Sequence, residues 1–83
     1  MIKILYFARL RDQLSCANES YELSTNESSV AEIKQQIASR GEPWTEVMQD
    51  ANLLVAVNQV IATPSTRVKA GDELGFFPPV TGG

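Results

Sequence analysis

The segment from residue 29 to residue 41 limits the fold of this chain more than any other. Ser29 and Glu32 have the spacing of a capping box, in which two side chains satisfy backbone N–H groups at the start of a helix. Gly41 suits the left-handed turn that ends many helices. The apolar residues between them recur at helical spacing: Val30, Ile33 and Ile37. A single helix with one apolar stripe needs a sheet to pack against, so the rest of the chain must supply one.

Segments with strand character flank this helix on both sides. Before it, residues 2–8 are rich in β-branched and aromatic types, and a second strand is predicted at 19–24 after a polar loop at 9–18. The segments after the helix are a short helical piece beginning at Pro43, an apolar run at 53–57, and strands at 60–61 and 74–77. This order predicts an α+β domain in which a mixed sheet carries the helix across one face.

The predicted strands carry apolar side chains on both faces. Alternation along each strand assigns one set to the helix side: Ile4, Tyr6, Val57 and Phe76. It assigns a second set to the opposite face: Leu5, Phe7, Ile61 and Phe77. An exposed apolar patch on a small domain usually marks a place of association. We therefore predict that the second set binds a protein partner.

The chain has no histidine and a single cysteine, Cys16. Without histidine it has no imidazole base near neutral pH, no Ser–His or Cys–His nucleophile pair and no imidazole ligand for a metal. One cysteine can form neither an internal disulfide nor a thiolate zinc site. We expect no metal site, a structural or incidental role for Cys16, and a solvated turn rather than a metal site or an acid–base pair at Asp72 and Glu73.

Charge and hydropathy argue against two further classes of protein. The net charge is −3 and the basic residues are scattered, so the sequence offers no basic stripe for nucleic acid. No apolar run approaches the ~20 residues that a membrane helix needs. The apolar start is interrupted by Lys3 and followed by Arg9, which is typical of a strand rather than of a signal peptide. The expected location is therefore the cytoplasm.

The one reactive group that the sequence offers is its C-terminal carboxylate. Pro78 and Pro79 stop the last strand, and the final residues, Val80, Thr81, Gly82 and Gly83, have no apolar face to pack. Glycines without Cβ atoms can pass through a narrow channel. At ~3.3 to 3.6 Å per residue, the residues after Phe77 can reach about 20 Å. We expect one domain over residues 1–83 with a flexible tail, 78–83, that can enter the active site of a partner.

The C-terminal run from Phe76 to Gly83 resembles the terminal signature of the molybdopterin synthase small subunits. The preceding Gly71-Asp72-Glu73, the start at 2–8 and the centre at 56–59 are similar to the same family. The resemblance spans the chain and is strongest at its end. It implies a ubiquitin-like β-grasp fold and the function of a sulfur carrier in molybdenum cofactor biosynthesis.

The resemblance also implies where the chemistry takes place. The terminal glycine, here Gly83, would be activated as a glycyl-adenylate and converted to a thiocarboxylate, 1-thioglycine. An adenylating, E1-like partner would supply the ATP, and a donor such as a cysteine desulfurase would supply the sulfur. The tail would then enter the large synthase subunit, in a heterotetramer of two small and two large subunits. The chain would act as the sulfur-donating subunit of a transferase complex, with no catalytic site or bound cofactor of its own.

Three other functions stay open on the sequence alone. Sulfur carriers for thiamin synthesis or tRNA thiolation share the β-grasp fold and the Gly-Gly end, although the Phe-Phe-Pro-Pro-Val-Thr prefix favours the molybdopterin family. A ubiquitin-like modifier would join Gly83 to lysines of target proteins. A plain interaction module would have an inert tail.

Overall fold

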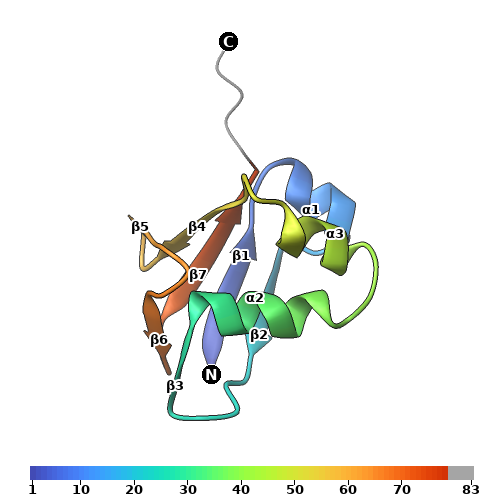
Figure 1. Ribbon diagram of the computed structural model, residues 1–83. Helices are drawn as coiled ribbons and strands as arrows, with labels where there is room; N and C mark the ends of the chain where they lie inside the picture. Colours follow the sequence, from blue (N-terminus) through green and yellow to red (C-terminus); the bar gives the residue numbers. More distant parts are fainter. Residues whose placement is uncertain (79–83) are drawn as a thin grey trace.

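The computed structural model describes residues 1–78 (Figure 1). Within them, the main sheet has five strands in the order β2-β1-β7-β4-β5. Their bounds are β1 Ile2–Tyr6, β2 Asn18–Tyr21, β4 Leu54–Val57, β5 Val60–Ile61 and β7 Glu73–Phe77. The central pair, β1 and β7, is parallel and the other neighbouring pairs are antiparallel. The sheet is therefore mixed, as predicted.

The helices lie on one side of this sheet. Their bounds are α1 Arg9–Leu14, α2 Val30–Ala38 and α3 Trp44–Gln49. Figure 1 shows α2 across one face of the sheet, with α1 and α3 beside the end at which β1 and β7 finish. The predicted α+β class is confirmed. None of the helices within residues 1–78 combines the length and the apolar character that crossing a membrane requires.

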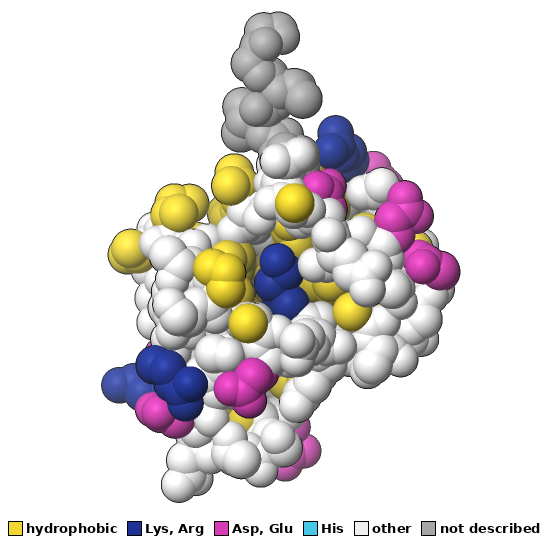
Figure 2. All heavy atoms as spheres, viewed as in Figure 1, with side chains coloured by type: hydrophobic (Ala, Val, Ile, Leu, Met, Phe, Trp, Pro, Cys, Tyr) yellow, Lys and Arg dark blue, Asp and Glu magenta, His cyan; other side chains and the backbone are white. Residues whose placement is uncertain are grey.

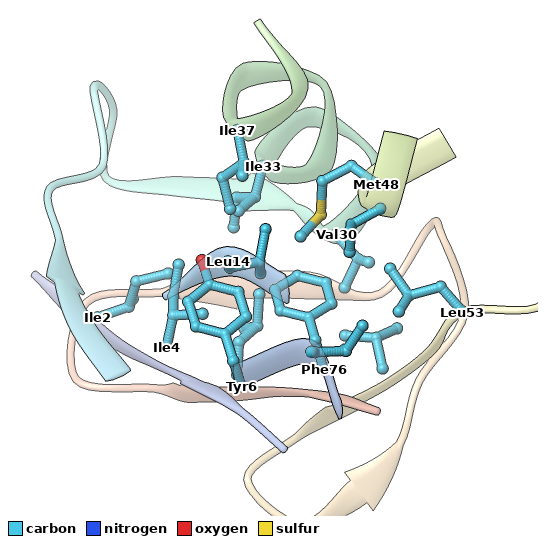
Figure 3. Close-up of a cluster of buried hydrophobic side chains, with 14 of the residues drawn as sticks. Ile2, Ile4, Tyr6, Leu14, Val30, Ile33, Ile37, Met48, Leu53 and Phe76 are labelled. Carbon is cyan, nitrogen blue, oxygen red and sulfur yellow. The ribbon is translucent and has the colours of Figure 1, made fainter. Parts of the chain in front are cut away.

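The helix α2 begins as the sequence predicts and packs on the predicted face. The Ser29 hydroxyl accepts a hydrogen bond from the Glu32 N–H at 3.2 Å. Figure 3 shows the side chains that meet between helix and sheet: Ile33 and Ile37 from α2, and Ile4, Tyr6 and Phe76 from the strands. Val57, predicted on the same face, is half-buried against this core. Full burial of one such side chain contributes roughly 1.5 to 3 kcal/mol, so this contact is the main link between helix and sheet.

Residues 9–14 form the helix α1, where the sequence predicts a polar loop. The loop prediction is wrong because Leu10 and Leu14, one turn apart, are both buried at this end of the core. The residues between them are polar and exposed. A six-residue helix of this composition has little intrinsic stability, so the burial of two leucines decides its structure.

A second, two-stranded sheet is absent from the sequence prediction. It pairs β3 Glu27–Ser29 with β6 Arg67–Lys69 in antiparallel register. Ser28 lies opposite Val68 and both are buried, while the flanking residues are mostly charged. The polar composition hides these strands from a hydrophobicity pattern. Two boundaries also differ slightly: β2 ends at Tyr21 rather than at residue 24, and α3 begins one residue after Pro43.

Candidate functional site

The rings of Phe7 and Phe77 stack on the sheet face opposite α2. Their centroids lie 4.6 Å apart and their planes differ by 3°. Gly75 lies against both rings, because a Cβ atom there would be 3.0 Å from Cε2 of Phe7 and 3.4 Å from Cε2 of Phe77. The strands β1 and β7 are parallel neighbours, so their C-terminal ends lie at the same end of the sheet. This arrangement brings the two rings together. The missing side chain at Gly75 leaves room for the ring pair to lie on the strand.

Leu5 and Ile61 lie on the same face as the ring pair. The register places Leu5 of β1 opposite Gly75 of β7, Gly75 opposite Ala56 of β4, and Ala56 opposite Ile61 of β5. Residues in register across neighbouring strands point to the same face. The four residues that strand alternation groups together, Leu5, Phe7, Ile61 and Phe77, therefore share one face. That they bind a partner stays a prediction.

Leu54 adds a residue that the sequence prediction missed. It lies opposite Phe77 in the register, and the residue is 37% exposed, compared with 38% for Phe7 and 69% for Ile61. A continuous apolar run such as that at 53–57 is typical of a strand covered on both faces, so the sequence pattern does not mark Leu54 as exposed. We name the set of Leu5, Phe7, Leu54, Ile61 and Phe77 the tail-exit patch.

The other end of the same sheet face is charged. Lys3 of β1 lies opposite Glu73 of β7. In the adjoining turn, the Asp72 carboxylate accepts hydrogen bonds from the Lys69 N–H at 2.9 Å and from Nδ2 of Asn58 at 3.1 Å. The bond from the Lys69 backbone, followed by that from Asn58, lowers the pKa of Asp72. The stacked rings thus lie at the end of this face where β7 leads into the tail, and the charged pair lies at the other end.

The tail begins at the tail-exit patch. Pro78 follows Phe77 directly and is half-buried. The other tail residues with a predicted function, Pro79, Val80, Thr81, Gly82 and Gly83, lie outside the described residues. Because β7 ends at Phe77, the chain that continues from Pro78 starts beside the stacked rings.

Cys16 has the environment of a structural residue. It is half-buried against the core, and its Sγ–H donates to the Asn18 carbonyl oxygen at 3.4 Å. Burial, with a smaller contribution from the Glu19 carboxylate, raises the pKa of the Cys16 thiol. A raised pKa keeps the sulfur protonated and weakly nucleophilic. Within residues 1–78 no three His, Cys, Asp or Glu side chains gather in a way that could hold a metal ion.

A hydrogen-bonded cluster around Glu19 joins the segment that follows α2 to the sheet. The Tyr6 hydroxyl donates to Oε2 of Glu19 at 2.7 Å, and the Arg40 guanidinium donates to both carboxylate oxygens at 2.8 and 2.9 Å. Arg40 also lies 4.6 Å above the centre of the Trp44 ring. The bonds from Arg40 lower the pKa of Glu19, whereas burial and the Glu19 carboxylate raise that of Tyr6. The sequence gives no signal for this cluster because its members are far apart in the chain.

Comparison with known sequences shows a full-length likeness. The chain matches the ThiS family over residues 4–83. It is 36% identical over 83 residues to the molybdopterin synthase sulfur carrier subunit of Escherichia coli, with 100% of both chains covered. It is 34% identical over 83 residues to the protein of the same name in Haemophilus influenzae, again with 100% of both chains covered.

Comparison with solved structures supports the same fold. The putative molybdopterin converting factor, subunit 1, of Pyrococcus furiosus superposes with a TM-score of 0.79 at 32% identity, over 95% of this chain and 97% of that chain. A chain in the complex of subunits 1 and 2 of the molybdopterin-converting factor of Helicobacter pylori superposes with a TM-score of 0.63 at 20% identity, over 99% of this chain and 97% of that chain. The second likeness is one of fold alone. Together with the strand order, these likenesses confirm the predicted β-grasp fold.

Proposed function

This chain belongs to the ThiS family and to the molybdopterin synthase sulfur carrier subunits, and from this premise we propose that it carries sulfur on the carboxyl carbon of Gly83. The observation that supports the proposal most is the identity of 34 to 36% along the whole chain to carriers of that name. The chain also ends in Gly82-Gly83 and has no histidine. Its terminal carboxylate is therefore the group best suited to carry the chemistry.

The first stage activates this carboxylate. One of its oxygens attacks the α-phosphorus of ATP, and pyrophosphate leaves to give a glycyl-adenylate at Gly83. The sequence has no Gly-rich phosphate loop, so an adenylating partner supplies the ATP site. The outer sulfur of a persulfide on a donor such as a cysteine desulfurase is released at the sulfide level by a thiol reductant, which is oxidised to a disulfide, and this sulfur then attacks the carbonyl carbon. AMP leaves with the electrons of the broken C–O bond, and Gly83 ends as a thiocarboxylate.

The second stage delivers the sulfur to a pterin precursor. A thiocarboxylate sulfur is anionic and nucleophilic at neutral pH, so this chain needs no general base of its own. After transfer, water releases the acyl group and restores the Gly83 carboxylate. The dithiolene product contains two sulfurs, and two charged tails are consumed for each product.

The tail-exit patch is the proposed docking surface for the large synthase subunit. Its apolar side chains are half-buried or exposed, and they share the sheet face on which Phe77 leads into the tail. Burying them against the partner would fix the base of the tail and so direct Gly83 into the partner's active site. The Helicobacter pylori complex of subunits 1 and 2 supports a partner of this kind. The expected assembly is a heterotetramer of two small and two large subunits.

Two variants of the chain end test the proposal in a reconstituted synthase. One lacks Gly83 and the other carries one extra residue after it. Both should lose product formation, because the carboxylate is displaced, and both should unfold at the same temperature as the native chain. Thr81→Ser is the matched control, since it changes the tail but keeps the terminal carboxylate in place. Product formation by either end variant would overturn the proposed terminal chemistry.

Experiments on the native chain also distinguish the alternative functions. Isopeptide-linked adducts between Gly83 and target lysines, formed without sulfur transfer, would identify a protein modifier. A chain that never accepts AMP from an adenylating enzyme would be an interaction module with an inert tail. Activity in thiamin synthesis or tRNA thiolation, without pterin product, would assign the chain to a different sulfur pathway.

A further inference from the structure

A groove between α2 and α3 lies on the helix side of the molecule, away from the tail-exit patch. Its volume is about 450 Å³. One stripe of α2 lines it with Ala31, Lys34 and Ala38, and α3 contributes Thr45 and Met48. The alanine side chains end at Cβ, so the surface is hollow on both sides of Lys34. Figure 2 shows a cationic side chain in a hollow over α2, with hydrophobic atoms around it.

Lys34 is the one charged side chain among the described residues that line this groove. It is half-buried, and among residues 1–78 it forms no ion pair and no side-chain hydrogen bond. The other lining residues are apolar or neutral, so no carboxylate of the groove itself balances the ammonium group. A cation that is partly removed from water without a counter-charge favours an incoming carboxylate.

We propose that this groove binds an extended segment of a protein partner in which one Asp or Glu lies between apolar side chains. The carboxylate pairs with Lys34, and the flanking side chains lie over Ala31 and Ala38, against Met48. The stripe from Ala31 to Ala38 is about 10 Å long at 1.5 Å per residue. About three residues of extended chain cover that length. At the rim, Gln35 and Gln49 offer amide groups to the backbone of the segment.

The position of the groove gives the binding a distinct consequence. The groove and the ring pair of Phe7 and Phe77 lie on opposite sides of the sheet, so the two surfaces can be occupied at the same time. The chain has a net charge of −3, so an acidic segment is attracted locally by Lys34 and not by the molecule as a whole. This binding does not depend on the chemistry proposed for Gly83.

The experiment titrates the full chain, labelled in its backbone amides and methyl groups, with capped tripeptides and records NMR spectra. The probe is Leu-Glu-Leu and its matched control is Leu-Gln-Leu, both at millimolar concentration because a contact of this size binds weakly. The Leu-Glu-Leu peptide should shift the methyl signals of Ala31, Ala38 and Met48. Lys34→Gln should weaken its binding roughly fivefold, the factor that corresponds to about 1 kcal/mol for one ion pair. Lys34→Arg should retain the binding.

Lys3→Gln serves as the charge-matched control, because it removes one cation on the opposite face of the sheet. Its binding of Leu-Glu-Leu should equal that of the native chain. Any of three results would overturn the proposal: no shift of the groove methyls with Leu-Glu-Leu, equal shifts with Leu-Gln-Leu, or binding that Lys34→Gln leaves unchanged. Shifts centred on Phe7 and Phe77 would likewise contradict it, since the segment would then bind the other face.

Discussion

Phe76 and Phe77 are adjacent in β7, yet their side chains lie on opposite faces of the sheet. Phe76 is fully buried beneath α2 and stacks on Tyr6, with ring centroids 5.8 Å apart. Phe77 is half-buried and stacks on Phe7 on the other face. Two neighbouring phenylalanines therefore have different roles: one is part of the core, and the other is part of the proposed docking surface.

This arrangement predicts opposite effects for two alanine substitutions. Phe76→Ala should lower the free energy of unfolding by roughly 3 to 5 kcal/mol, because it leaves a cavity in the core. Phe77→Ala should lower stability much less, but should weaken binding to the large subunit by ~2 kcal/mol or more, as loss of an aromatic anchor does. Denaturant unfolding of both variants and calorimetric titration with the large subunit measure the two effects. Equal destabilisation by the two variants would mean that Phe77 belongs to the core.

Asn58 holds the turn between β4 and β5 to the start of β7. Its Oδ1 accepts from the Glu73 N–H at 3.0 Å, and its Nδ2 donates to Asp72 at 3.1 Å. Asn58 also adopts a positive φ of 50°. Asn58→Ala loses both hydrogen bonds. It also places alanine in the left-handed region, which asparagine tolerates better. We therefore expect the free energy of unfolding, measured by heat or denaturant, to fall by ~2 to 3 kcal/mol.

Two further variants separate these causes. Asn58→Gly relieves the backbone cost but still loses both bonds, so it should be less stable than the native chain and more stable than Asn58→Ala. Gln59, at φ 70°, is the matched position with a similar backbone. Gln59→Gly should be neutral or slightly stabilising. If Asn58→Gly matched the native chain, the side-chain bonds would contribute nothing.

The bonds from Arg40 to Glu19 predict an acid-dependent part of the stability. They hold the pKa of Glu19 below its ordinary value of 4.5 in the folded chain. A carboxyl whose folded pKa is depressed stabilises the fold above the unfolded pKa, and this contribution disappears as the pH falls through the folded pKa. Glu19→Gln should therefore be less stable than the native chain at pH 7, and the difference should shrink below pH 4.5.

The control for this effect is Glu27→Gln, which removes the other ion pair of the described chain, that with Arg67. The side chains of Glu27 and Arg67 are 55% and 56% exposed, compared with 20% and 32% for Glu19 and Arg40. An exposed pair contributes little, so Glu27→Gln should change the pH profile of unfolding hardly at all. Identical profiles for Glu19→Gln and the native chain would contradict the role of the Glu19 cluster.

The features that the sequence predicts correctly depend on neighbours along the chain. Ser29 and Glu32 define the start of α2 by their spacing alone, and strand alternation alone separates Phe76 from Phe77. The exposure of Leu54 was missed because it belongs to the continuous apolar run at 53–57, which does not show whether the strand is covered on one face or on both. The Glu19–Arg40 pair joins residues 21 positions apart and requires the folded chain. Helix α1 was missed because its stability comes from burial of Leu10 and Leu14, not from its composition.

The two parts of the proposed site, the tail-exit patch and Gly83, were predicted from different kinds of evidence. The tail-exit patch follows from alternation in the strands, and the structure places its members on one face. The proposed role of Gly83 rests on the terminal residues and on the family; residues 79–83 lie outside the described part of the chain. The groove at Lys34 needed the folded chain, since residues of both α2 and α3 line it.

The central claim is that sulfur is carried on Gly83, and the intact mass of the chain tests it most directly. The chain is incubated with ATP, an adenylating enzyme and a sulfur donor, and its mass is measured together with that of its C-terminal fragment. We predict an increase equal to the replacement of one oxygen by sulfur, located in the fragment that contains Gly83 and unchanged in Cys16→Ala. An unchanged mass, or added sulfur that is found on Cys16 instead, would contradict the account.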